Sequence, residues 1–263
     1  MEIKGIFDSH AHYEDRRFDE DRDNLLRGMK ESGVDYIVNV GSSIDTTKKT
    51  ILLTEQYDFI YGSAGVHPEE CKDMKDDDLL FLEEVCKHNK IVAVGEIGLD
   101  YYWDEPARDI QKKWFRKQLE LAVKVNLPVI IHTRDAIEDT MNILKEYTPL
   151  MSQGIHGVIH CFSGSAQSAA EFVKMGYYIG IGGVVTFKNA KKLKEVAQEI
   201  PIENIVIETD CPYMAPEPYR GKRNDSSYLS YVVSKLAKIK GISEQEVTEI
   251  TAENALRMYR MNK

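Results

Sequence analysis

Ile6-Phe7-Asp8-Ser9-His10-Ala11-His12 is a short apolar run that ends in two histidines two residues apart. Because a β-strand alternates its faces, Asp8, His10 and His12 are expected to point the same way. Two imidazoles on one face of a strand can hold one divalent metal ion. Buried histidines also serve as ordinary hydrogen-bonding groups, so this motif by itself leaves a metal site and a structural pair as alternatives.

Eight short β-rich runs recur along the chain at intervals of roughly 30 residues, as a repeated strand–helix unit would. These runs are Ile3–Phe7, Tyr36–Val40, Ile60–Val66, Ile91–Val94, Pro128–Ile131, Gly157–Ile159, Tyr177–Ile181 and Ile205–Ile207. Stretches of helical period lie between them, and Ser243-Glu244-Gln245-Glu246 is typical of the start of another helix. We therefore predict a single domain over residues 1–263, an α/β (β/α)8 TIM barrel with an extra C-terminal helix packed on its outside.

Residues suited to metal ligation follow five of these runs. They are His10 and His12, Glu96, His132, His160 and Asp210. A single polar residue at the edge of a core has ordinary structural explanations, but the carboxyl ends of barrel strands meet at one rim, where active sites are built. Four imidazoles and two carboxylates are enough to hold two divalent ions, and Zn, Mn, Mg, Ni and Fe are all compatible with them.

Four carboxylates have predicted roles at this rim. Glu96 can bridge two ions, because a carboxylate has two oxygens. Asp210 can bind one ion and accept the proton of an attacking water, which makes it the predicted catalytic residue. Asp8 and Glu208 are expected to share the faces of the ligands one layer deeper, where they would support the ligands from behind.

The remaining histidines and two cysteines have simpler expectations. Cys161 and Cys211 each follow a ligand and should face the helix layer as small buried groups. His67 ends the third run, where it either lines the pocket or is structural. His88 and His156 precede strands and are expected at the surface.

Composition limits the class of protein. The net charge of −9 argues against a broad basic face for tight duplex binding, although it leaves room for a small phosphate pocket. No apolar run approaches the ~20 residues that span a bilayer, and the first residues contain no signal-peptide core. The four cysteines form no CxxC pair, so a reducing cytoplasm is the expected location and no membrane association is expected.

Seven segments together resemble the TatD family of metal-dependent deoxyribonucleases, within the amidohydrolase-like barrels. The segments are Phe7–His12, Gly65–Pro68, Gly95–Tyr101, Pro128–Arg134, His160–Gly164, Glu208–Pro212 and Arg220–Asn224. The resemblance implies metal ligation by the six residues named above and hydrolysis of phosphodiesters in DNA. The chain departs from the family pattern at Tyr13-Glu14 and at Asp225-Ser226. These two departures affect expected substrate contacts, and neither falls on an expected metal ligand.

Cations near the expected rim are candidate phosphate contacts. Three of them stand within four residues in the loop after the eighth run, and one follows the fifth: Arg220, Lys222, Arg223 and Arg134. Arginine can bind phosphate oxygens in a bidentate manner. A solvated charged loop is the alternative for the group of three.

Aromatic residues after the ligand-bearing runs can either stack on a terminal base or pack within the protein. They are Tyr101, Tyr102, Trp103 and Phe162.

An acidic protein with a small basic pocket favours exonuclease-like trimming of single-stranded DNA or frayed 3′ ends, and no obligate protein partner is indicated. Two alternatives are hydrolysis of a small phosphoester, lactone or acyl substrate on the same barrel, and a non-enzymatic scaffold.

Overall fold

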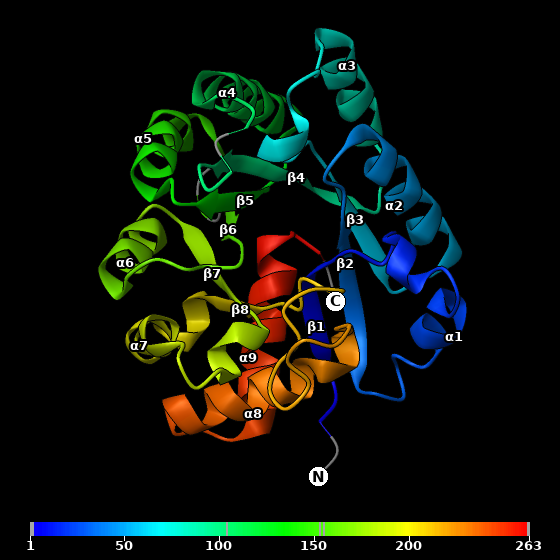
Figure 1. The fold of residues 1–263 in the computed structure, drawn as a ribbon, viewed down its shortest axis with the longest axis vertical. Helices are drawn as coiled ribbons and strands as arrows, with labels where there is room; N and C mark the ends of the chain where they lie inside the picture. Colours follow the sequence, from blue (N-terminus) through cyan, green and yellow to red (C-terminus); the bar gives the residue numbers. More distant parts are fainter. Residues whose placement is uncertain (1–2, 104, 153, 155, 262–263) are drawn as a thin grey trace.

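Eight parallel strands form one sheet in which every strand pairs with the next along the chain. The computed structural model describes residues 3–103, 105–152, 154 and 156–261. The strands are β1 (Ile6–Ala11), β2 (Val34–Val40), β3 (Ile60–Ala64), β4 (Ile91–Asp100), β5 (Val129–Arg134), β6 (Gly157–Ile159), β7 (Tyr177–Ile181) and β8 (Ile205–Ile207). Figure 1 shows the strands curling into a ring with the helices outside it, so the predicted (β/α)8 barrel is confirmed.

The ring closes between β1 and β8 through residues that carry candidate ligands. Ala11 and Cys211 form an isolated parallel bridge. The Asp210 amide donates to the His10 carbonyl at 2.9 Å, and the His12 amide donates to the Cys211 carbonyl at 2.8 Å. The first and last strands are therefore fixed together at their carboxyl ends.

Helices cover the outside of this sheet. They are α1 (Arg22–Arg27), α2 (Ile44–Gln56), α3 (Asp76–Val85), α4 (Arg108–Val125), α5 (Ile137–Tyr147), α6 (Ala166–Lys174), α7 (Lys191–Glu199), α8 (Leu229–Lys240) and α9 (Glu244–Met258). Within the described residues, no helix is both long and apolar enough to cross a membrane.

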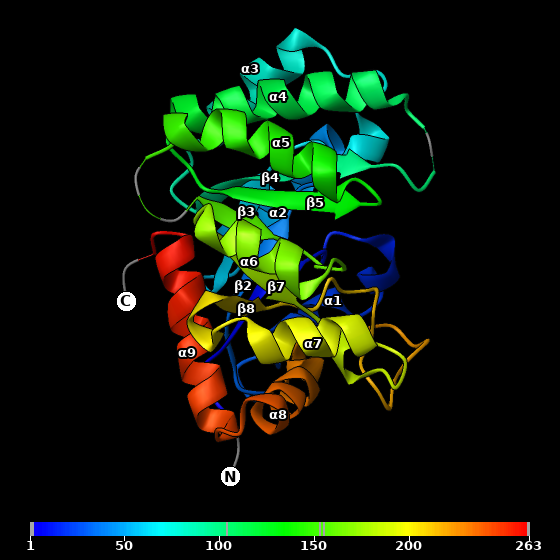
Figure 2. The same cartoon turned by 90° about the vertical axis from the view of Figure 1, so that its left-hand side faces the viewer.

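The extra C-terminal helix, α9, lies over the amino ends of the strands (Figure 2). Leu256, Met258 and Tyr259 join Phe7 and Val206 in one buried apolar cluster. The Tyr259 hydroxyl donates to the Ser9 carbonyl at 2.8 Å. The predicted helix is thus present, and its apolar side closes the mouth of the barrel opposite the candidate site.

Strand boundaries differ from the expected ones where the candidate ligands begin. The structure extends the first strand to Ala11, the fourth to Asp100 and the fifth to Arg134, whereas the last three predicted strands agree with it. An apolar run stops at the first polar residue, but the ladder of a neighbouring strand carries the backbone further. Gly98 pairs with His132 in this extended part of the sheet.

We expect the Asn254→Ala variant to lose stability. The Asn254 side-chain amide is buried and donates to the carbonyls of Ile202 and Ile205, each at 2.8 Å. Removing it leaves two buried acceptors without their donor, at a cost of about 2–3 kcal/mol in the free energy of unfolding. Urea unfolding measures this loss. Gln245→Ala, at an exposed position on the same helix, is the control and should change stability by less than about 0.5 kcal/mol.

Candidate metal centre

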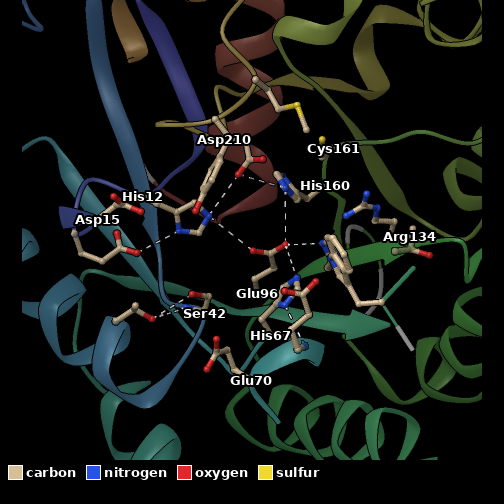
Figure 3. A pocket seen from close by; sticks show the side chains of 18 of the residues that line it. His12, Asp15, Ser42, His67, Glu70, Glu96, Arg134, His160, Cys161 and Asp210 are labelled. Atoms are coloured by element: carbon tan, nitrogen blue, oxygen red, sulfur yellow. Dashed lines mark hydrogen bonds and ion pairs between the residues drawn. The ribbon is translucent and has the colours of Figure 1, made fainter. Parts of the chain in front are cut away.

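A cavity of about 760 Å³ opens at the carboxyl ends of the strands. Five of the six predicted ligands line it, namely His12, Glu96, His132, His160 and Asp210. Figure 3 labels four of these five, all but His132. The sixth, His10, is fully buried, with its ring stacked on His160 at a centroid distance of 3.5 Å. The structure therefore brings together all six side chains from five different strand ends.

The first group of donor atoms comes from β1, β4 and the segment after β8. The Nε2 atoms of His10 and His12 lie 3.0 Å apart. Glu96 Oε2 lies 3.5 Å from His10 Nε2, and Asp210 Oδ1 lies 3.5 Å from His12 Nε2. Donors placed tetrahedrally at ~2.0–2.1 Å from a zinc-sized ion are separated by about 3.3 Å. The donor set and its spacing therefore fit a divalent ion.

The second group surrounds the other oxygen of Glu96. Oε1 lies 3.0 Å from His132 Nδ1 and 3.8 Å from Nε2 of both His160 and His67. Because the two oxygens of one carboxylate face different histidines, Glu96 occupies the position that a bridging ligand between two ions requires. His67 lines the cavity. Of the two alternatives that the sequence left for this residue, pocket lining is the one observed.

Charge in this group is balanced between the buried carboxylate and its histidines. Burial alone would raise the pKa of Glu96, but His10 and His132 hold that pKa well below its usual range. Burial opposes protonation of His132, yet Asp100 and Glu96 raise its pKa to about 9. Glu96 is therefore anionic at neutral pH, the form in which a carboxylate binds a cation.

Hydrogen-bond acceptors behind two histidines orient the rings. His12 Nδ1 donates to the Val40 carbonyl at 3.0 Å and lies 3.3 Å from Glu14. His160 Nδ1 lies 3.1 Å from Glu208, whose other oxygen accepts from the Cys161 amide at 2.6 Å. With Nδ1 of each ring directed at these oxygens, Nε2 of each ring faces the cluster. Glu208 thus lies behind a ligand, where the sequence predicted it.

Two supporting carboxylates were not found from the sequence. Asp100 Oδ2 lies 2.9 Å from His132 Nε2 and is buried. Glu14 lies behind His12. Both stand near predicted ligands in the chain, four residues after Glu96 and two after His12, and that proximity was the available signal.

Asp8 supports the site in a different way from the one expected. A register shift between Asp8 and Ala11 interrupts the alternation of β1. The Asp8 carboxylate accepts from the amide and hydroxyl of Thr209 at 3.0 and 2.6 Å and from the Ser226 hydroxyl at 2.6 Å. Asp8 therefore anchors the backbone next to Asp210, and its carboxylate does not contact the ring of His10 or His12.

Two further expectations, those for Cys161 and His156, need correction. Cys161 has a φ of 44° and lines the cavity, whereas a residue facing the helix layer was expected. Cys211 is buried as predicted. His156 is buried, with its ring against Tyr177, so it is not a surface residue. Phe162 is buried against Phe172 and is unavailable for base stacking.

Of the four candidate phosphate contacts, only Arg134 is among the described residues that line this cavity. Its guanidinium stacks on Tyr102, 3.7 Å from the ring centre. Arg223 instead pairs with Asp21 at 2.6 Å, and Arg220 lies over the ring of Phe187 at 4.4 Å. Lys222 is exposed on the same loop. The three cations of this loop are therefore absent from the described lining of the cavity.

Known proteins share both the fold and the length of this chain. The model of the TatD related DNase family matches residues 7–260. A relative from Bacillus subtilis, the uncharacterized metal-dependent hydrolase YabD, is 47% identical and is covered over 100% of its length, against 98% of this chain. The crystal structure of YjjV, a TatD homologue from Escherichia coli, superimposes with a TM-score of 0.90 at 30% identity and 98% coverage of both chains. A TatD family hydrolase from Entamoeba histolytica gives 0.86 at 26% identity, covering 98% of this chain and 99% of that one.

An eight-stranded barrel with a histidine–carboxylate cluster at the carboxyl ends of its strands has the architecture of metal-dependent hydrolases. Within that class, the chain belongs to the TatD related DNase family.

We expect Glu208→Gln to weaken metal binding while the fold is kept. The amide oxygen can still accept from Cys161, but the charge facing His160 is lost. Loss of such a partner lowers metal affinity by about 10–100-fold. Isothermal titration of the apo protein with Zn²⁺ and with Mn²⁺ measures this change. Glu199→Gln, an exposed position on α7, is the matched control and should bind as the wild type does.

Proposed function

We propose that this protein is a divalent-metal-dependent deoxyribonuclease that hydrolyses phosphodiester bonds. The observation that carries the proposal is the placement of Glu96, whose two oxygens face separate histidine groups at the floor of an open cavity. Two ions would be held by His10, His12, Glu96, His132, His160 and Asp210. Bound there, the ions would supply Lewis acidity toward a phosphoryl oxygen and acidify a water molecule.

The residues of the chain would then orient the substrate and manage the proton. The Asp210 side chain is 18% exposed, and its Oδ1 faces His12 at the edge of the cavity. It can accept the proton of the attacking water as a general base. Arg134, held in place by Tyr102, can donate to a non-bridging phosphate oxygen.

DNA is favoured as the substrate by the family and by the phosphate-binding chemistry of Arg134. The cavity wall carries more carboxylates than cations, with Glu14, Asp15, Glu69 and Glu70 beside Arg16 and Lys49. Such an acidic rim disfavours a long polyanion lying across the site and suits the end of a single strand. We therefore propose exonuclease-like action on single-stranded or frayed 3′ ends. Arg220, Lys222 and Arg223 are left as contacts for phosphates further along a longer strand.

In this function, residues 1–263 would act as one hydrolase domain in the cytoplasm. No obligate protein partner would be needed.

Chelation and Asp210→Asn are each expected to remove most activity. On a 5′-labelled single-stranded oligonucleotide, metal-stripped protein should be inactive and should recover on addition of Zn²⁺, Mn²⁺, Mg²⁺, Ni²⁺ or Fe²⁺. Asp210→Asn should lower kcat by about 10²–10⁴-fold, because the acceptor of the water proton is lost. Asp109→Asn, at an exposed position of α4, is the control and should retain full activity.

Three results would contradict parts of this proposal. A near-normal rate for Asp210→Asn excludes that residue as the base. Equal rates on closed circular single-stranded DNA and on the linear oligonucleotide exclude an exonuclease mode. Turnover of lactones or acyl esters without turnover of DNA under any of these metals excludes a deoxyribonuclease.

Arg134 and Arg220 are expected to differ in their contribution to catalysis. Arg134→Gln removes a cation from the cavity wall and should raise KM by about tenfold, since a charge-assisted hydrogen bond is worth roughly 1.5–3 kcal/mol. Arg220→Gln alters a side chain that lies over Phe187 and should change KM by less than about twofold on a dinucleotide. Steady-state kinetics on a dinucleotide separates the two. Equal effects would show that the loop cations reach the scissile phosphate.

A further inference from the structure

A second cavity, of about 480 Å³, adjoins the candidate metal centre. Cys161, Asp210 and Met214 line both cavities, so the two share one wall. Figure 3 shows Cys161 beside His160, on the side away from Glu96. A substrate held at Asp210 is therefore next to this second space, and nothing in the proposed chemistry uses it.

Apolar groups form much of the lining of the second cavity. Val184, Ala190 and Leu193 contribute side chains, and Gly182 and Gly183 contribute bare backbone. A Cβ atom at Gly183 would lie only 2.2 Å from the Met214 carbonyl, so the closeness of these two segments excludes a side chain there. The cavity is therefore an apolar space with a smooth backbone face, suited to a flat apolar ring.

The second cavity also carries charged groups of both signs. Asp210 lines both cavities, and Glu208 lies behind the ligand His160. Lys191 and Lys192 line the second cavity from the start of α7, both exposed, and no salt bridge joins either lysine to a carboxylate within the described part of the chain. An occupant that matches this lining places a flat apolar ring in the cavity and carries anionic groups for bound metal and for the lysines.

We propose that this second cavity binds the nucleobase of the nucleotide attached to the scissile phosphate, while Lys191 and Lys192 contact the neighbouring phosphate. The assignment rests on the proposed deoxyribonuclease function and adds a base-binding subsite to it. Continuity with the metal centre places the base next to the bond that is cut. A simple acyl chain would contact the apolar lining but would leave the two lysines without an anion.

Filling the cavity tests the assignment. Val184 is half-buried and lines the cavity, so Val184→Phe reduces the space for a base. The substrates are two 5′-labelled single-stranded oligonucleotides that differ only at the 3′-terminal residue, thymidine in one and an abasic tetrahydrofuran in the other. Val184→Phe should lower kcat/KM about tenfold on the first and less than about twofold on the second, as expected when contacts to one base are lost.

Two controls keep this test independent of folding. Val173→Phe makes the same change at a half-buried position of α6 outside both cavities and should leave the ratio between the two substrates unchanged. Ala190→Leu fills the cavity from another side and should reproduce the effect if Val184→Phe fails to fold, as judged by circular dichroism. Equal loss on both substrates, or no loss on either, in a folded cavity variant would overturn the subsite.

The lysines are tested separately. The double change Lys191→Gln and Lys192→Gln should lower kcat/KM about tenfold on a trinucleotide, whereas Lys188→Gln, on the segment before α7 and outside the cavity, should stay within about twofold. If the double variant has the same kcat/KM as Lys188→Gln, then Lys191 and Lys192 do not contact the neighbouring phosphate.

Equilibrium binding separates failure of the subsite from failure of the proposed function. Titration calorimetry of the metal-loaded protein with thymidine 5′-monophosphate and with 2-deoxyribose 5-phosphate reports the base contact without turnover. The wild type should prefer the nucleotide about tenfold, and Val184→Phe should abolish that preference. If no DNA is cleaved but this preference is observed, the function is wrong and the base site stands. If DNA is cleaved without the preference, the base site is wrong and the function stands.

Discussion

The hydrogen bonds that join β1 to β8 are the constraint on which the rest of the site depends. The Asp210 amide donates to the His10 carbonyl, so a ligand from each end of the chain is fixed to the other through backbone. Asp8 strengthens the same junction, because its buried carboxylate accepts from Thr209 and Ser226. The same backbone hydrogen bonds therefore close the barrel and hold the first group of donor atoms together.

A second constraint is the cost of burying the charge of Glu96. An isolated carboxylate in an apolar interior is strongly disfavoured. Here the cost is offset by histidines on both sides, His10 toward one oxygen and His132 toward the other. The outer nitrogen of His132 is held in turn by Asp100. The result is a buried carboxylate flanked by histidines, which also places their inner atoms where a cation can bind.

The two ends of the barrel divide the tasks of stability and chemistry. At the amino ends, α9 closes the barrel with Phe7, Leu256 and Tyr259 in one apolar cluster. At the carboxyl ends, the side chains become polar and the cavity opens to solvent. Met214 and Cys161 stand between the metal centre and the apolar cavity beside it. Soft, adaptable side chains at such a boundary suit a substrate that occupies both spaces.

Much of the fold and the ligand set could be predicted from the sequence alone, because both depend on patterns of neighbouring residues. Apolar runs at a regular interval predicted eight strands, and an abrupt polar ending marked the residues that would meet at the rim. Three matters depended on tertiary structure. The carboxylates behind His12 and His132 could be assigned only once neighbouring strands were aligned. The bulge in β1 turned Asp8 away from the ligand face, against simple alternation. The loop after β8 turned Arg223 toward Asp21 and Arg220 onto Phe187, away from the cavity.

The sequence by itself determined which residues have the chemistry of a metal centre, since that depends on residue type and strand period. Only the tertiary structure decided which side chains face the cavity, since side-chain direction depends on register, bulges and partners distant in the chain.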